Sequence, residues 1–195
     1  MPITTQAAFP TTTAGRITAV EAEISAVLAR TSTADLEAVT TALLKAGHVF
    51  VTGEGRSGFM ARAFAMRLMH LGLHVHVIGE TTTPAVGEGD TLVAVSGSGT
   101  TTGTVRVAET AARSGAHVLA VTTDPGSPLG TAAAISLVVP AATKLRRADE
   151  APTIQPLSSL FDQATHLLLD VICLGIAAAR NVDNSAAASR HANTE

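Results

Sequence analysis

Two glycine-rich turns hold the residues best suited to bind an anion. The first, GEGRSG over residues 53–58, follows the apolar run Val49, Phe50 and Val51, and the second, SGSGTT over residues 96–101, follows another apolar run. A pattern of helical spacing comes after each turn, and the free N–H groups at a helix start attract anions. Hydroxyl donors on a glycine-rich backbone suit the oxygens of a phosphate monoester. We therefore expect phosphate-binding residues in both turns: Gly55, Arg56, Ser57, Ser96, Gly97, Ser98, Thr100 and Thr101.

Other interpretations of the two turns stay open at this point. The first turn fits G-x-G-x-x-G as Gly53, Gly55 and Gly58, with Glu80 at the distance of about 20 residues or more that is typical of dinucleotide-binding proteins. It could also be a tight strand-to-helix turn with no ligand, in which Ser57 is only the N-cap. The second turn does not match G-x-x-x-x-G-K-[ST], which argues against a nucleoside triphosphate cradle. A Ser/Thr/Gly helix cap without a ligand is its alternative interpretation.

The elements that position these turns alternate in type along the chain. Strands are expected at residues 49–51, 74–78, 91–95, 117–121 and 135–139, and helices at 17–28, 36–44, 57–71, 101–114, 125–133 and about 157–179. Strands that alternate with helices predict an α/β fold, a doubly wound five-stranded parallel sheet flanked by helices. Both turns then lie at the carboxyl ends of strands, where such sheets bind ligands.

Composition narrows the class of protein. The chain has 195 residues, of which 46% are apolar but only 3% aromatic, and its formal net charge is −3. A length of this order favours one domain, and a slightly acidic chain without basic runs argues against nucleic-acid binding. We expect a flexible leader at residues 1–15, one domain at 16–180 and a tail at 181–195. The lone Cys173 suits a reducing compartment, and no signal peptide or long membrane-spanning stretch is apparent, which predicts a cytoplasmic protein.

Six segments form an ordered set from about residue 53 to the end of the chain. They are GEGRSG, FAMRLMHLGL, GETTTPAVGEGD, SGSGTT, IQPLSSLFDQ and RHANTE. Together they resemble the sugar isomerase (SIS) domain, and more narrowly the 6-phospho-3-hexuloisomerase family. The chain departs from that family at two positions where many members have Glu, namely Asp162, a carboxylate shorter by one methylene, and Thr100.

The resemblance implies an isomerase of the ribulose monophosphate pathway that interconverts D-arabino-hex-3-ulose 6-phosphate and D-fructose 6-phosphate, with no cofactor and no metal. Such a reaction needs a group that removes a proton from one carbon and returns it to the next. Asp162 is the first candidate for this base, and Glu80 is the competing carboxylate. Arg56 is expected to stabilise phosphate or enediolate charge. Without the resemblance, Asp162 with His166 and Asp170 would be interpreted as a solvated helix stripe.

The tail and the apolar helices lead to two further expectations. His191, in the polar ending RHANTE, is expected to lie over an active site of its own or of a neighbouring chain. The nearly all-apolar helix at residues 57–71 predicts a homodimer or homotetramer. Two other functions stay open, a non-catalytic phosphosugar-binding SIS regulatory module and, less favoured, a dinucleotide-binding oxidoreductase. In the leading hypothesis the partner is a small sugar phosphate, without nucleic acid or membrane.

Overall fold

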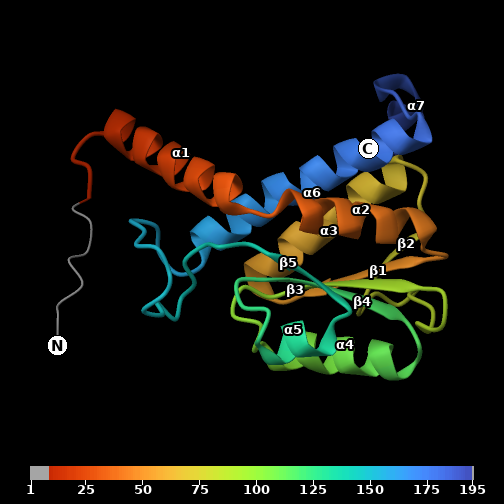
Figure 1. Cartoon of the computed structure of the whole chain (residues 1–195). Helices are drawn as coiled ribbons and strands as arrows, with labels where there is room; N and C mark the ends of the chain where they lie inside the picture. The colour runs from red at the N-terminus through yellow and green to blue at the C-terminus, as the bar shows by residue number, and fades with distance from the viewer. Residues whose placement is uncertain (1–8, 195) are drawn as a thin grey trace.

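The computed structural model describes residues 9–194 and contains one parallel sheet between two layers of helices (Figure 1). The strands are β1 (Val49–Gly53), β2 (Val75–Val77), β3 (Thr91–Val95), β4 (His117–Thr122) and β5 (Ile135–Val138). All pair in parallel, in the order β2-β1-β3-β4-β5. The predicted fold class is therefore confirmed. Strand order reverses between β1 and β3, so the crevice beside their carboxyl ends is the site where such folds bind ligands.

Helices cover both faces of the sheet (Figure 1). On one side lie α2 (Thr33–Lys45), α3 (Gly55–His70) and α6 (Ser159–Arg180), with α1 (Thr13–Arg30) packed on α6 and extending beyond the sheet. On the other side lie α4 (Thr102–Arg113) and α5 (Pro128–Ala132), and α7 (Asn184–Ala188) follows α6. This is the doubly wound arrangement that the alternation of elements predicts.

Alternate residues of the central strands face opposite helical layers. In β1, Val49 and Val51 join the core beneath α3 and α6, whereas Phe50 joins the core beneath α4 and α5. β3 and β4 repeat this alternation, and every residue of β3 is buried. A strand that is covered on both faces must be apolar at each position, which explains the continuous apolar runs of the sequence.

Two helix starts differ from the sequence prediction. α1 begins at Thr13, inside the predicted leader, because the Thr12 hydroxyl accepts a hydrogen bond from the N–H of Gly15 and caps the helix. Residues 1–8 of that leader lie outside the described residues. The prediction that Ser57 is an N-cap is wrong, since α3 already begins at Gly55 and Glu54 is its N-cap. Gly55 has φ of 58°, a left-handed conformation that lets the chain turn immediately after β1.

The last long helix, α6, has 22 residues, most of them apolar. By length and composition it could cross a membrane, contrary to the expectation that no stretch is long enough, yet 56% of its apolar window is buried inside the protein. It packs against α1, α2 and α3 and contributes Phe161, Leu169 and Ile172 to the core. Its apolar composition is that of a core helix of this fold.

Candidate active site

The first turn and the start of α6 meet through one buried carboxylate. Asp162 lies in the first turn of α6 with only 2% of its surface exposed. Its Oδ1 accepts a hydrogen bond from the Ser57 hydroxyl at 2.9 Å, and its Oδ2 accepts one from Arg56 Nε at 3.1 Å. The fold thus brings Asp162 to two predicted site residues, Arg56 and Ser57, that lie more than 100 positions earlier in the chain. Ser57 serves here as a donor to Asp162.

The surroundings of Asp162 favour its protonated form. Burial raises the pKa of this carboxyl above its usual value, and the hydrogen bonds from Ser57 and Arg56 with the Arg56 charge oppose that rise without cancelling it. A carboxylate whose pKa is shifted toward neutrality is a more effective general base than an exposed one. Asp162 therefore has the environment of a proton-transfer group. The stripe interpretation holds only for His166 and Asp170, which are exposed and lie 3.7 Å apart.

The second turn arranges its hydroxyls in pairs. The oxygens Ser96 Oγ and Thr101 Oγ1 are 2.9 Å apart, and Thr100 Oγ1 donates to Ser98 Oγ at 2.9 Å. Thr101 is the N-cap of α4, but its side chain makes no capping bond to the helix, so the cap leaves the first N–H groups of α4 to other acceptors. A phosphate at this helix start would meet both N–H and O–H donors.

Close approaches at two glycines hold the second turn beside the first. A Cβ on Gly97 would lie 3.0 Å from the Phe161 ring, so the start of α6 packs directly on the second turn. A Cβ on Gly103 would lie 1.9 Å from a carboxylate oxygen of Glu54, so a residue of the first turn reaches the start of α4. Both turns and the first turn of α6 therefore surround one place at the carboxyl edge of the sheet.

Two predicted residues lie apart from Asp162. Glu80 follows β2 and forms an exposed ion pair with Arg62, a contact that explains its position without a catalytic role. His191 stacks on His70 with ring centroids 5.3 Å apart, at the end of α3 that is opposite to Arg56. Between Arg56 and His70 the helix rises roughly 20 Å. Within one chain, the tail therefore does not cover the site of Asp162.

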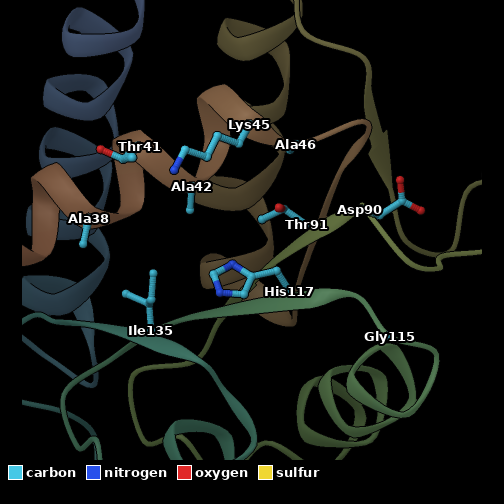
Figure 2. A pocket seen from close by; sticks show the side chains of 11 residues that line it. Ala38, Thr41, Ala42, Lys45, Ala46, Asp90, Thr91, Gly115, His117 and Ile135 are labelled. Carbon is cyan, nitrogen blue, oxygen red and sulfur yellow. The ribbon is translucent and has the colours of Figure 1, made fainter.

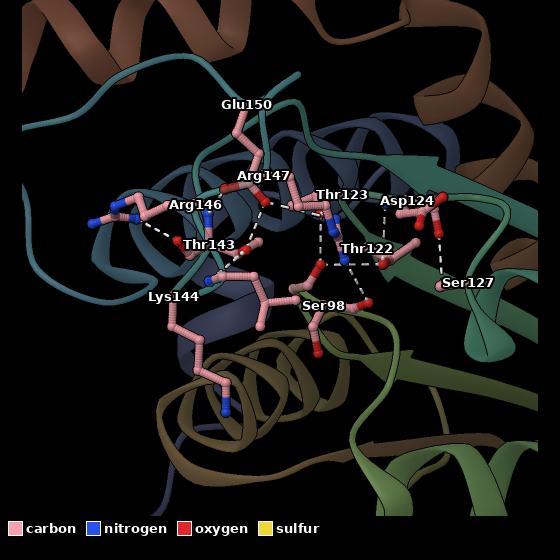
Figure 3. Close-up of polar contacts among 12 residues, drawn as sticks. Ser98, Thr122, Thr123, Asp124, Ser127, Thr143, Lys144, Arg146, Arg147 and Glu150 are labelled. Carbon is pink, nitrogen blue, oxygen red and sulfur yellow. Dashed lines mark hydrogen bonds and ion pairs between the residues drawn. The ribbon is translucent and has the colours of Figure 1, made fainter. Parts of the chain in front are cut away.

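The structure adds one residue that the sequence reasoning missed. Arg147, in the loop between β5 and α6, donates to the Ser98 carbonyl at 3.1 Å and to Thr123 Oγ1 at 3.1 Å (Figure 3). In the sequence, the only feature that pointed to this residue was the pair of consecutive arginines, Arg146 and Arg147. Charged residues in an irregular segment are more often solvated than part of a binding site. Arg147 brings a positive charge to a turn that has none of its own.

A separate cavity of about 540 Å³ opens at the other edge of the sheet (Figure 2). It lies between α2 and the amino ends of β3, β4 and β5, where Lys45, Thr91, His117 and Ile135 line it. Because the anion turns are at the carboxyl ends of the same strands, this cavity is not part of the site around Asp162.

Comparison with known proteins identifies the class of domain that this fold and site define. The family model described as "SIS domain" matches residues 42–166, a range that contains both turns and Asp162. The chain belongs to the SIS domain family.

The relatives within that family are more specific. The 3-hexulose-6-phosphate isomerase of Mycobacterium gastri is 40% identical over 173 residues, which are 89% of this chain and 86% of that protein. The protein of the same name from Bacillus subtilis is 37% identical over 78% of this chain and 83% of its own length. A crystal structure from Methanococcus jannaschii, from which the function of 3-hexulose-6-phosphate isomerase was inferred, matches with a TM-score of 0.78 at 30% identity, covering 92% of this chain and 98% of that one. These matches confirm the resemblance drawn from the six segments.

The raised pKa of Asp162 predicts a pH-dependent stability. Since the folded-state pKa lies above the unfolded one, the stability that Asp162 contributes is fully present below the unfolded value and is lost as pH rises through the folded value. Asp162→Asn removes this dependence, so its free energy of unfolding relative to wild type should rise in urea titrations as the pH increases from about 4, the ordinary pKa of an Asp carboxyl, toward neutrality. A constant difference across this pH range for Asp162→Asn would contradict the assignment.

Proposed function

We propose that the protein interconverts D-arabino-hex-3-ulose 6-phosphate and D-fructose 6-phosphate. The observation that carries this proposal is the buried Asp162 carboxylate, held by Ser57 and Arg56 beside a second turn rich in phosphate donors. The names of the relatives from Mycobacterium gastri and Bacillus subtilis support the same activity. The residues of the site then divide between two tasks, proton transfer and phosphate binding.

Proton transfer falls to Asp162. To move the carbonyl from C3 to C2, the base takes the proton from C2, a cis-enediolate forms, and the proton returns to C3. Asp162 acts as base in the first step and as acid in the second, and its raised pKa suits both steps. Arg56 and the Ser57 hydroxyl hold the carboxylate in place, and the Arg56 charge stabilises the negative enediolate.

Phosphate binding falls to the second turn, with the start of α3 as the second contact. Ser96 and Ser98 are almost buried, at 3% and 8% exposure, so their hydroxyls act in a partly dry environment. Charge-assisted hydrogen bonds in such surroundings contribute about 1.5 to 3 kcal/mol each. This arrangement supports a sugar phosphate as ligand. We further propose a cytoplasmic location, which the sequence predicts, and a role in formaldehyde fixation through the ribulose monophosphate pathway, which the family resemblance implies.

Replacing Asp162 by Asn should lower turnover of fructose 6-phosphate roughly a hundredfold or more, because an amide keeps the shape of the side chain but accepts no proton. Formation of the 3-ketose measures turnover, and calorimetry should find the affinity for fructose 6-phosphate within a few-fold of wild type. Asp170→Asn is the matched control and should keep full activity. If Glu80→Gln lowers turnover more than Asp162→Asn does, Glu80 is the base instead. If wild type forms no 3-ketose, the proposed reaction is wrong.

A homo-oligomer is the assembly that the exposed apolar residues support. α6 presents Leu167, Val171 and Leu174 at 40%, 49% and 70% exposure, a stripe of helical spacing, and the adjacent α3 presents Phe59 at 65% and Met66 at 51%. Exposed apolar rows on two neighbouring helices are typical of subunit interfaces. We propose that copies of this chain associate through them as a dimer or tetramer.

Leu174→Glu should convert the oligomer to monomers, since a charge would be buried at each contact. Light scattering at micromolar concentration measures the mass. Glu37→Gln on α2 is a surface control and should leave the mass unchanged. A monomeric mass for wild type would contradict the proposed assembly.

The tail is proposed to act on a neighbouring chain. Arg190 donates to the His70 carbonyl at 3.2 Å and His191 stacks on His70, so the tail is held at the end of α3 that is far from Asp162. Burial, together with the nearby charges of Arg67 and His191, lowers the pKa of His70. Within an oligomer, this end of one chain is available to approach the site of another.

Deletion of residues 189–195 should leave fold and mass intact but reduce turnover at least about tenfold, since it removes a group that shuttles hydroxyl protons near neutrality. His191→Ala should account for much of that loss, and Asn193→Ala is the control without a titratable group. Turnover, circular dichroism and light scattering are measured together. Full activity of the truncated protein would mean that the tail has no catalytic part.

A further inference from the structure

The segment between β5 and α6, residues 139–158, contains no helix or strand, yet it is held at three places. We call this segment the strap. Arg146 links distant parts of the strap, because its guanidinium donates to the carbonyls of Gln155 at 2.6 Å and Leu157 at 2.8 Å and also to the Thr143 carbonyl. Arg146 has φ of 48°, a conformation that is uncommon for a residue with a side chain. Its three carbonyl partners compensate for that conformation, and the next residue, Arg147, projects from a fixed point.

The strap is also tied to the first helix. Glu23 of α1 accepts hydrogen bonds from the Thr153 hydroxyl at 2.6 Å, from the Ile154 N–H at 2.7 Å and from Gln155 Nε2 at 3.0 Å. One carboxylate thus fixes three consecutive residues. The strap is therefore a rigid support rather than a loose connection.

Arg147 links this support to the second anion turn. Its two terminal nitrogens bind the Ser98 carbonyl and the Thr123 hydroxyl, and that hydroxyl in turn donates to the Gly97 carbonyl at 2.8 Å (Figure 3). The carbonyl oxygens of the turn are thereby drawn toward the strap. Because carbonyl oxygens repel an anion and N–H groups attract it, this orientation favours phosphate binding at the turn.

Arg147 forms an ion pair with Glu150 as well as its bonds to the second turn and Thr123. Its nearest carboxylate, Glu150, lies 3.6 Å away, and both Glu150 oxygens already accept shorter bonds from the N–H and hydroxyl of Thr143. Among the described residues, Arg56 bonds Asp162, at 3.1 Å, and bonds no residue of the second turn. Three quarters of the Arg147 side chain is buried, so water screens its charge weakly. Among the residues that the structure describes, Arg147 is the cation that hydrogen-bonds the second turn.

We propose that Arg147 is the positioning residue of the phosphate turn and supplies the positive charge that selects a phosphate dianion. It acts through the backbone of Ser98 and through Thr123, and it does not take part in proton transfer. This inference rests on the proposed sugar phosphate site around residues 96–101 and deepens it.

The test compares Arg147→Gln with Arg147→Lys and with Arg113→Gln, an exposed arginine on α4 that bonds only Thr110. Arg147→Gln should weaken the binding of fructose 6-phosphate in calorimetry roughly tenfold or more, and should raise KM while kcat stays within about threefold. Arg147→Lys should recover part of the affinity because it keeps the charge and one donor. Arg113→Gln should bind like wild type.

Measuring the affinity for fructose 6-phosphate over a pH series separates the effect of the Arg147 charge from the effect of the side chain's shape. The second pKa of a phosphate monoester is about 6, so the affinity ratio between wild type and Arg147→Gln should grow from about pH 5.5 to about pH 8 as the dianion forms. A ratio that does not change with pH, or an Arg147→Lys variant no better than Arg147→Gln, would overturn the proposal. Affinity of Arg147→Gln within about threefold of wild type would also overturn it. If wild type itself binds no fructose 6-phosphate, the proposed function fails together with this inference.

Discussion

The burial of one carboxylate governs the arrangement of this site. A charged Asp162 with 2% exposure is costly unless it is hydrogen-bonded, and its two donors come from one short turn, Arg56 and Ser57. α6 must therefore start directly above the carboxyl end of β1, and that requirement fixes where the strap after β5 ends. The raised pKa that results is a property of proton-transfer groups and a cost to stability above that pKa. The proposed proton transfer and the stability of the fold therefore oppose each other at this residue.

Small residues make the close packing around Asp162 possible. Gly58 lies so near the end of β1 that a Cβ would be 2.6 Å from the Gly53 carbonyl oxygen, and Gly97 lies directly beneath the Phe161 ring. Without side chains at these positions, α3 and α6 approach the sheet closely enough for the two anion turns and the carboxylate to share one crevice. Gly99, with φ of 64°, bends the second turn so that its carbonyl accepts the N–H of Leu129 in α5. The glycines of both motifs thus have a steric reason, independent of the proposed ligand binding.

The two edges of the sheet have different characters. The carboxyl edge collects the two glycine-rich turns, Asp162 and Arg147, whereas the opposite edge holds the cavity lined by Lys45 and His117 and the contact between His70 and His191. α3 spans the distance between the edges, with Arg56 at its start and His70 at its end. In the proposed oligomer, the exposed apolar residues of α3 and α6 that lie between these two ends would contact neighbouring chains.

Local patterns in the sequence determined much of this protein. Apolar runs that alternate with helical patterns predicted all five strands, the helices between them and the position of both turns at one edge, because burial on both faces dictates composition position by position. The six family-like segments directed attention to Asp162, which spacing alone would have assigned to a solvated stripe.

Sequence reasoning failed where a role depends on a distant partner or an irregular backbone. It made Ser57 a helix cap, because the left-handed Gly55 that starts α3 earlier is a matter of backbone conformation. It did not find Arg147, since no periodicity marks a strap whose shape is set by hydrogen bonds to α1 and to the second turn. Only the tertiary structure decided that Asp162 is buried and His191 lies at the far end of α3, because burial and charge depend on contacts between segments about a hundred residues apart, which no local pattern encodes.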